Sequence, residues 1–171
     1  MNKVLESGIF NRAISLKRNE FLKTQGSIDS QIYFIKSGSL KISVYKSHQE
    51  QIIRLGYEGN LIVALDSFIH ERSSDYVIQA IKKSDILVAT KKDFMEWLNT
   101  SSDHQVWYTQ MLENLILQQL EREKDLLTDS PQERYQRVMD RNPQLFQIIP
   151  HKHIANYLRM SPETLSRLKK S

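Results

Sequence analysis

The C-terminal segment of the chain holds six side chains whose types and spacing suit hydrogen bonding to DNA. They are Glu163, Thr164, Ser166, Arg167, Lys169 and Lys170. An arginine can pair bidentately with guanine, and a glutamate can accept a hydrogen bond from the amino group of cytosine. A helix that turns these side chains outward would therefore suit the major groove. The same spacing also fits an ordinary solvated helix face, on which Glu163 and Arg167 pair one turn apart.

Two short helices would have to position these side chains. Ser161 offers an N-cap hydroxyl for the second helix, and Pro162 stands at its first position, where the missing N–H costs nothing. The apolar spacing predicts the buried side of each helix. The inward residues would be Ile154, Ala155 and Leu158 in the first helix, and Leu165 and Leu168 in the second.

Positive charge is concentrated around this helix pair. Residues 131–171 contain eight Lys or Arg against three Asp or Glu, whereas the first 130 residues contain 16 and 17. A phosphate-binding module requires such a surplus, and Lys152 would add a phosphate contact. Arg159 stands in the turn, where glycine commonly permits a left-handed backbone. We expect this to cost about 1 kcal/mol and the side chain to be able to reach a phosphate.

A long helix is predicted before this basic segment, over Asp103–Leu127. The stretch has no glycine or proline and is rich in good helix formers. Its apolar positions leave surface that must pack against the β domain or a second copy of the helix. The apolar pattern of this helix is interrupted by Gln118, Gln119, Arg122 and Glu123. Ser130 is then the expected cap of a further helix at Pro131–Asp140.

The first hundred residues predict an antiparallel β structure, a sandwich or a barrel. Gln31–Tyr45 contains two apolar runs separated by Ser37-Gly38-Ser39, which indicates a hairpin. In its second arm apolar and polar residues alternate, so we expect one face to be buried and Lys41 and Ser43 to point outward. Further short runs are Gln51–Leu55, Leu61–Leu65, Tyr76–Ile81 and Ile86–Ala89, followed by a short helix at Lys91–Leu98.

Composition excludes several classes of protein. The 171 residues are 40% hydrophobic and 26% charged, as in a soluble globular protein, and contain no cysteine. No stretch approaches the roughly 20 apolar residues of a membrane span, and no signal peptide is evident, so we expect a cytoplasmic protein without a membrane partner. No glycine-rich phosphate loop or nucleophile context is present, so we expect no enzyme and no catalytic residue. His151 and His153 would point roughly 200° apart on a helix, so we expect no metal site.

The order of these elements resembles the Crp/Fnr family of bacterial transcription regulators over essentially the whole chain. The most specific element is Glu163-Thr-Leu-Ser-Arg167, which is similar to the Glu-x-x-Ser-Arg signature of the Fnr-like recognition helix. The segments Tyr33–Lys41 and Tyr57–Leu61 resemble the cyclic-nucleotide-binding-type β-roll of the family.

The resemblance implies an α+β fold with three parts. Residues 1–102 would form an antiparallel, jelly-roll-like β-roll that senses or scaffolds, residues 103–128 a long dimerisation helix, and residues 129–171 a helix-turn-helix domain in a short form without a wing. A homodimer would bind a palindromic operator in double-stranded DNA, with half-sites about 34 Å apart. RNA polymerase and an unknown small-molecule effector remain open as partners. The alternative is a sensor or protein-interaction module that no longer reads DNA.

The resemblance also implies an effector pocket. Its candidate residues are Gly59, Asn60, Leu61, Arg72, Ser73, Ser74, Gln118 and Gln119. Nucleotide-binding members carry Gly-Glu for a ribose hydroxyl and an arginine for the cyclic phosphate. Here Asn60 replaces the glutamate, Arg72 comes a few residues early, and Asp75 would repel an anion. We therefore do not expect cyclic AMP, and the absence of cysteine removes the oxygen-sensing cluster of the Fnr branch. The effector is unknown or absent, and the two glutamines fit equally a role in dimer register.

Overall fold

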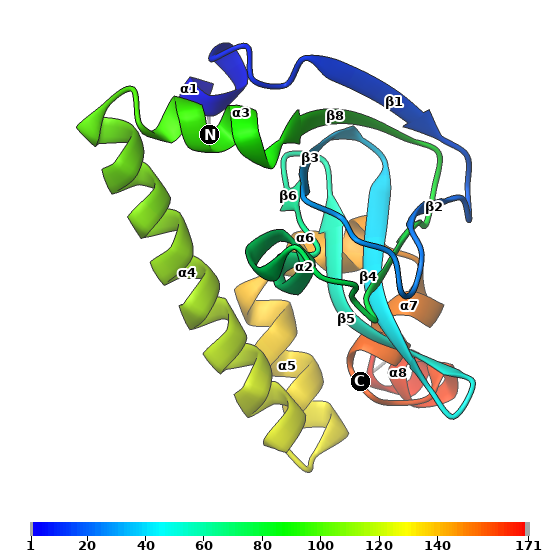
Figure 1. Ribbon diagram of the computed structural model, residues 1–171. Coiled ribbons are helices and arrows are strands. Elements are labelled where there is room, and N and C mark those ends of the chain that lie inside the picture. The colour runs from blue at the N-terminus through cyan, green and yellow to red at the C-terminus, as the bar shows by residue number, and fades with distance from the viewer. Residues whose placement is uncertain (1, 170–171) are drawn as a thin grey trace. The chain divides into compact units, whose positions relative to one another are not determined.

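The computed structural model describes residues 2–169, and the chain divides into two compact units, one up to Gln105 and one from Val106 onward (Figure 1). The helices of the first unit are α1 (Asn2–Glu6), α2 (Leu65–His70) and α3 (Lys91–Leu98). Its strands are β1 (Arg12–Leu16), β2 (Phe21–Lys23), β3 (Gln31–Ser37), β4 (Ser39–Lys46), β5 (Gln49–Tyr57), β6 (Leu61–Ile62), β7 (Val77–Ala80) and β8 (Ser84–Thr90). Helix α4 (Ser102–Leu127) begins in this unit.

The described strands form two antiparallel four-stranded sheets, ordered β1-β8-β3-β6 and β2-β7-β4-β5. Apolar side chains from both sheets meet in one core, because alternate residues of each strand point to the same side. The core residues are Leu16, Tyr33, Ile35, Leu40, Ile42, Ile62, Ala64, Ile78, Ala80, Ile86 and Val88. This confirms the predicted antiparallel β-roll.

The predicted hairpin over Gln31–Tyr45 is wrong, because β3 and β4 lie in different sheets. The turn at Gly38 instead carries the chain from one sheet to the other. Gly38 has a φ of 90°, and a Cβ atom there would lie 2.3 Å from Ser84 Oγ, so only glycine fits. The observed hairpin joins β4 to β5 through Ser47 and His48, whose positive φ values of 50° and 63° match a type I′ turn.

The expectation that only one face of β4 is buried is also wrong. Lys41 and Ser43 are buried together with the apolar residues of the strand. The ammonium of Lys41 lies 2.6 Å from a carboxylate oxygen of Glu50, and the Ser43 hydroxyl donates to the same carboxylate at 2.9 Å. Paired polar groups can be buried on a face that alternation alone assigns to solvent.

Helix α3 and the strand positions predicted after Gln51 are confirmed in outline. The Leu61–Leu65 run is a strand only as far as Ile62, because α2 begins at Leu65. Strands β1 and β2 and helix α2 were not predicted, because they are short and carry little apolar periodicity.

The second unit contains most of α4, followed by α5 (Pro131–Arg141), α6 (Pro143–Ile148), α7 (His151–Tyr157) and α8 (Pro162–Leu168). The start of α5 is as predicted, with the Ser130 hydroxyl accepting from the Glu133 N–H at 3.2 Å. The core of the second unit is formed by Val138, Leu145, Phe146, Ile149, Ile154, Ala155, Leu158 and Leu165. Between residues 2 and 169, no helix has the length and apolar character needed to cross a membrane.

Candidate functional site

Helices α7 and α8 are joined by a tight turn that was predicted from the sequence. Arg159 has a φ of 55°, the left-handed conformation expected at this position. The N–H groups of Arg159 and Met160 donate to the carbonyls of Asn156 and Ala155, each at 3.0 Å. The Ser161 hydroxyl then accepts from the Thr164 N–H at 3.1 Å and caps α8. The turn therefore ends one helix and starts the next within four residues.

The face of α8 agrees largely with the prediction. Leu165 is fully buried, whereas Leu168 is only half-buried. The side chains of Glu163, Ser166, Arg167 and Lys169 are exposed. Thr164 is half-buried, and its hydroxyl lies 3.2 Å from Ser161 Oγ. Lys170 lies outside the described residues.

Glu163 is held as a carboxylate at the start of α8. Its pKa lies below the ordinary value because its own backbone N–H and the Ser161 side chain bond the carboxylate, with a smaller contribution from the charge of Arg167. A negative charge at a helix N-terminus is also favoured by the helix dipole. The group is therefore an acceptor over the physiological pH range, as an interaction with a base amino group requires.

Further basic residues lie on the same helix pair. Lys152 is exposed in the first turn of α7, and Arg159 is exposed in the turn. Lys169 Nζ lies 2.6 Å from His151 Nε2, which connects the end of α8 to the start of α7. With Arg167, these side chains give the α7–α8 pair a cationic surface.

Helices α4 and α5 contact the α7–α8 turn through two buried arginines. Arg122 of α4 donates from Nη2 to the carbonyl of Tyr157, and its Cζ lies 3.7 Å from the centroid of the Tyr157 ring. Arg134 of α5 donates from Nη1 to Thr128 O at 2.6 Å, and its Nη2 lies 3.4 Å from Arg159 O. From the sequence, Arg122 was predicted only to interrupt the apolar pattern of the long helix.

A carboxylate of α4 pairs with the arginines of α5. Asp125 is fully buried, and Arg137 Nε lies 3.1 Å from its Oδ1, while Arg141 bonds its Oδ2. Glu121, one turn earlier, contacts Arg137 Nη2 at 2.9 Å. Burial lowers the pKa of Arg141, but the hydrogen bond and the charge of Asp125 raise it by more than burial lowers it. The net shift of the pKa is therefore upward. This network fixes the end of α4 against α5.

In the first unit, Asn60 satisfies its own turn. Its side-chain oxygen accepts from the Tyr57 N–H at 3.2 Å, and its backbone N–H donates to Tyr57 O at 3.0 Å. Gly59 beside it has a φ of 87°, and Leu61 begins β6. The side chain that replaces the family's ribose-binding glutamate is therefore hydrogen-bonded within its own turn.

The segment predicted to meet a phosphate is bonded to the loop before β3. Ser74 is buried, its N–H donates to Ser27 O at 3.3 Å, and its Oγ accepts from the Tyr76 N–H at 3.0 Å. Lys23 is also buried, and its ammonium donates to the carbonyls of Ser74 and Tyr76 at 3.1 and 2.7 Å. Burial lowers the pKa of Lys23.

The remaining effector candidates are exposed. Arg72 and Ser73 are exposed beyond the end of α2, and the Arg72 carbonyl accepts from the Ser67 hydroxyl at 2.7 Å. Gln118 and Gln119 are exposed on α4, in the second unit. Among the described residues, no group of acidic, histidine or cysteine side chains is arranged to hold a metal ion.

Residues 13–101, just over half of the chain, match the family model of the cyclic nucleotide-binding domain. The chain therefore belongs to the cyclic nucleotide-binding domain family. A comparison with curated protein sequences gave no match.

Several solved structures share the fold over most of the chain. FixK2 from Bradyrhizobium japonicum superposes with a TM-score of 0.77 at 14% identity, covering 93% of this chain and 82% of FixK2. A mutant of CooA from Carboxydothermus hydrogenoformans gives 0.75 at 16% identity, covering 98% and 81%. The c-di-GMP responsive global regulator CLP from Xanthomonas campestris gives 0.71 at 13% identity, covering 99% and 90%. At these identities the likeness establishes the fold.

The family implies a cyclic nucleotide, but the residues of this roll do not fit one. The Asn60 oxygen bonds the backbone of its own turn, and an amide lacks the charge of a glutamate. At the phosphate position, the Ser74 N–H and the Lys23 ammonium are both bonded within the chain. Ser73 and Ser74 carry no guanidinium, so a cyclic phosphate at this position would lack the bidentate charged partner that the family's arginine provides.

Proposed function

We propose that the chain is a DNA-binding transcription regulator of the Crp/Fnr type, with α8 as its recognition helix. The observation that carries the proposal is the capped α7–α8 pair, on which Glu163 and Arg167 are exposed one turn apart. The fold likeness supports it, because the matched structures include one named as a global regulator and one named as a transcriptional regulator of the CRP family.

Different side chains of the α7–α8 pair would contact bases and phosphates. Arg167 would read guanine and Glu163 the cytosine amino group, with Ser166 and Thr164 at adjacent bases or phosphates. Lys152, Arg159, Lys169 and Lys170 would contact phosphates and set affinity rather than specificity.

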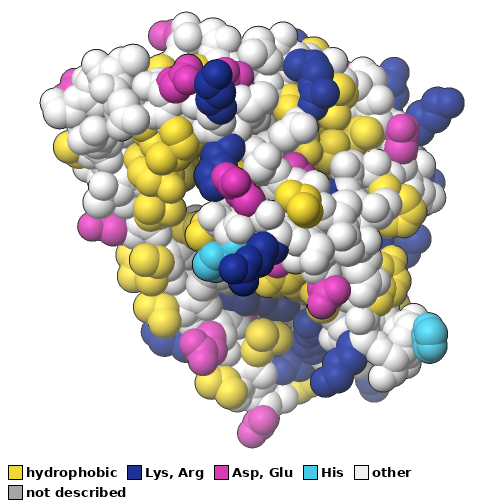
Figure 2. Space-filling model, in the orientation of Figure 1, with side chains coloured by type: hydrophobic (Ala, Val, Ile, Leu, Met, Phe, Trp, Pro, Cys, Tyr) yellow, Lys and Arg dark blue, Asp and Glu magenta, His cyan; other side chains and the backbone are white. Residues whose placement is uncertain are grey.

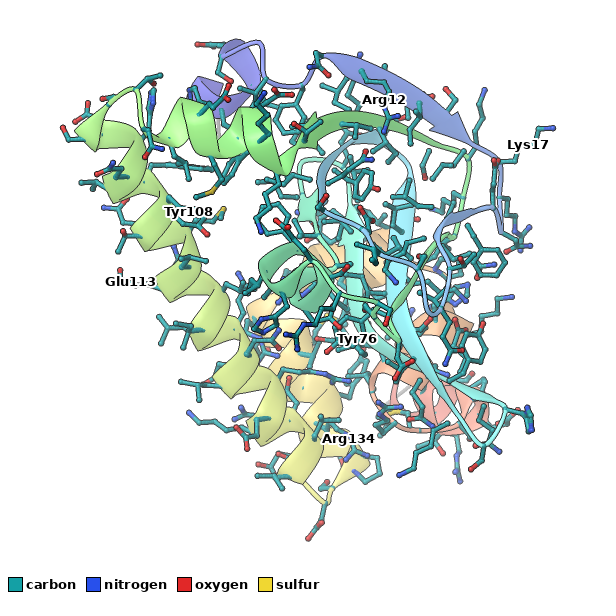
Figure 3. All side chains as sticks on the ribbon, viewed as in Figure 1. Arg12, Lys17, Tyr76, Tyr108, Glu113 and Arg134 are labelled. Atoms are coloured by element: carbon teal, nitrogen blue, oxygen red, sulfur yellow. The ribbon has the colours of Figure 1, made fainter. Side chains whose placement is uncertain are left out.

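A dimer would present two such helices to a palindromic operator. Four apolar residues of α4 are exposed, Val106 (56%), Ile116 (59%), Leu120 (48%) and Leu127 (75%). Their positions fall on one heptad row, because the intervals between them are sums of three- and four-residue steps. Glu113 occupies the same row, on the side of α4 that faces away from α5 (Figure 3). Hydrophobic side chains recur along α4 in the space-filling view (Figure 2). Pairing of this row with a second copy would bury it.

Regulation would act through the spacing of the two recognition helices. An effector in the β-roll, where one exists, would favour one of two dimer geometries and so shift the population able to bind the operator. A roll without an effector would act as a scaffold for a constitutive DNA binder.

Selection of duplexes from a random DNA pool tests the proposal. A palindromic winner should bind much more tightly than a scrambled copy at moderate salt. Arg167→Ala should cost about 1–3 kcal/mol for the lost base contact and relax specificity at one position. Lys92→Ala, which removes one exposed charge from α3, is the matched control and should leave specificity unchanged.

Two outcomes would count against the proposal. Equal and steeply salt-dependent binding to the winner and the scrambled copy would mean that the basic helices merely attract phosphate. A pool without any enriched sequence would favour the alternative, a sensor or protein-interaction module of the same fold.

A further inference from the structure

We propose that Arg122 and Arg134 are positioning residues of the recognition helix, which they orient by binding the carbonyl oxygens of the α7–α8 turn. The proposal rests on the function proposed for α8. It assigns to α4 and α5 a part in DNA recognition although their arginines would not touch DNA.

Arg122 makes the closest contact to the turn. Its side chain is 7% exposed, and its guanidinium both donates to the Tyr157 carbonyl and lies over the Tyr157 ring at 3.7 Å. Tyr157 is the last residue of α7. Two different contacts to one residue fix its position more tightly than either contact alone, because each restricts a different direction of movement.

Arg134 contacts the next part of the turn from α5. Its side chain is 8% exposed and reaches two carbonyls, Thr128 O at 2.6 Å and Arg159 O at 3.4 Å. The first carbonyl belongs to the segment between α4 and α5, and the second to the left-handed residue of the turn. Arg134 therefore connects the end of α4 to the turn that orients α8 (Figure 3).

The conformation of the turn explains why it benefits from such support. A helix C-terminus leaves carbonyls without intrahelical partners and carries partial negative charge, which guanidinium groups can neutralise. Arg159 has a φ of 55°, which is strained for a residue other than glycine. Without support, the turn would therefore tend to move toward a less strained backbone conformation. One guanidinium binds the carbonyl of Tyr157, two residues before the strained position, and the other binds the carbonyl of Arg159 itself, so together they hold the turn in place.

Stability alone does not account for these buried cations. Arg122 Nη1 and Arg134 Nε are buried without a hydrogen-bond partner among the described residues. Burial lowers the pKa of Arg122, and the nearby charges of Arg159 and Arg141 act in the same direction, against Tyr157 and Asp125. Replacing a buried charge network with apolar side chains of similar volume is often neutral for stability. We therefore expect methionine at position 122 or 134 to preserve folding and to loosen the turn.

The experiment compares the wild-type chain with its Arg122→Met and Arg134→Met variants. Arg137→Met is the matched control, because it removes the same charge from α5 at a residue that contacts Glu121 and Asp125 and not the turn. Amide hydrogen exchange over residues 157–168 should speed up in the first two variants and not in the control. Binding to the operator selected for the wild type should weaken between about twofold and thirtyfold, with unchanged dimerisation.

Two further variants separate positioning from a structural role. Arg122→Lys keeps a cation near the Tyr157 carbonyl and should recover part of the lost affinity, even if a methionine variant folds poorly. Arg159→Gly removes the strain of the left-handed position. Combined with Arg134→Met, it should restore slow exchange in the turn, and loss of packing alone would show no such rescue.

The arms distinguish failure of the inference from failure of the proposed function. If the wild type selects no operator, the proposed function fails, whereas the exchange measurements still report on the turn. If the wild type binds an operator and the methionine variants exchange and bind as the Arg137→Met control does, the inference is overturned. Equal effects of all three substitutions would also overturn it, because they would report charge rather than position.

Discussion

The guanidinium of Arg122 lies over the ring of Tyr157, with 3.7 Å between Cζ and the ring centroid. The two residues are 35 positions apart, one on α4 and one at the end of α7. Arginine suits this contact because its flat, weakly hydrated cation can stack on a ring and still donate to a carbonyl in the ring's own residue. The pair therefore joins the long helix to the first helix of the α7–α8 pair.

Removal of the Tyr157 ring should destabilise the helical unit. We expect Tyr157→Leu to cost about 0.5–2 kcal/mol, because the cation loses its aromatic partner, and Tyr157→Phe to remain close to the wild type, because the ring is kept. Urea unfolding followed by helical circular dichroism measures both variants. Equal stability of the leucine and phenylalanine variants would show that the stacking contributes nothing.

Loss of the Asp125 carboxylate should leave two arginines without their buried partner. Breaking a buried pair costs about 3–5 kcal/mol, but Arg137 and Arg141 are 30% and 34% exposed and can turn toward water. We therefore expect Asp125→Ala to cost about 1–3 kcal/mol in chemical denaturation. A double-mutant cycle with Arg141→Ala should show a coupling, and purely additive losses would contradict the pairing.

The cap of α8 should respond to mutation and to pH. Ser161→Ala should cost about 1 kcal/mol and raise the pKa of Glu163 toward its ordinary value, because it removes a hydrogen bond from the helix start and from the carboxylate. Since the folded-state pKa of Glu163 is lowered, its stabilising contribution is present above the ordinary value of 4.5 and is lost as pH falls through the folded-state pKa. An NMR titration of the Glu163 carboxyl checks this, with Glu163→Gln lacking the transition.

Arg159→Gly should stabilise the protein and weaken DNA binding at the same time. Glycine adopts a φ of 55° without strain, which we expect to be worth about 0.5–1 kcal/mol in thermal unfolding. If Arg159 contacts a phosphate, the salt dependence of DNA binding should also fall by about one counterion. A variant that loses stability would indicate that the arginine side chain contributes more than its backbone strain costs.

Cyclic AMP and cyclic GMP should leave the melting temperature of the chain unchanged. A ligand present at 100 times its dissociation constant would add about 2.7 kcal/mol to stability, which a thermal scan detects easily. The Asn60 and Ser74 contacts within the chain predict no such gain. A saturable upward shift with either nucleotide would contradict the interpretation of this region.

The α7–α8 pair was predictable because its signals are local. The Ser161 cap, Pro162 and the buried Leu165 all act within a few residues of the turn, so the sequence displays them side by side. The β3–β4 hairpin was mispredicted because a glycine turn looks the same whether the chain pairs with itself or crosses to a second sheet. Contacts between residues distant in sequence were not predicted at all. Arg122 was therefore noticed only as a polar residue in an apolar pattern, and its contact with Tyr157 was missed.

The burial of Lys41 and Lys23 illustrates the same limit within the β-roll. Each lysine would be assigned to solvent by its charge, and each is buried because acceptors from another strand or loop surround its ammonium. Alternation reports hydrophobicity and not the availability of a partner, which depends on the tertiary fold.

Helix α4 is continuous from Ser102 to Leu127, so the residues along it keep fixed angles to one another about the helix axis. An α-helix turns by about 100° with each residue, so the azimuth of Leu120 about the helix axis is fixed relative to that of Arg122. An insertion of one residue between Gln110 and Leu115 would rotate the part of the exposed row before the insertion by about 100° relative to Arg122, which contacts Tyr157. An insertion of seven residues would nearly restore the phase. Insertions into α4 that keep the exposed row and the α7–α8 pair in their present angular relation should therefore add about 7 or about 11 residues.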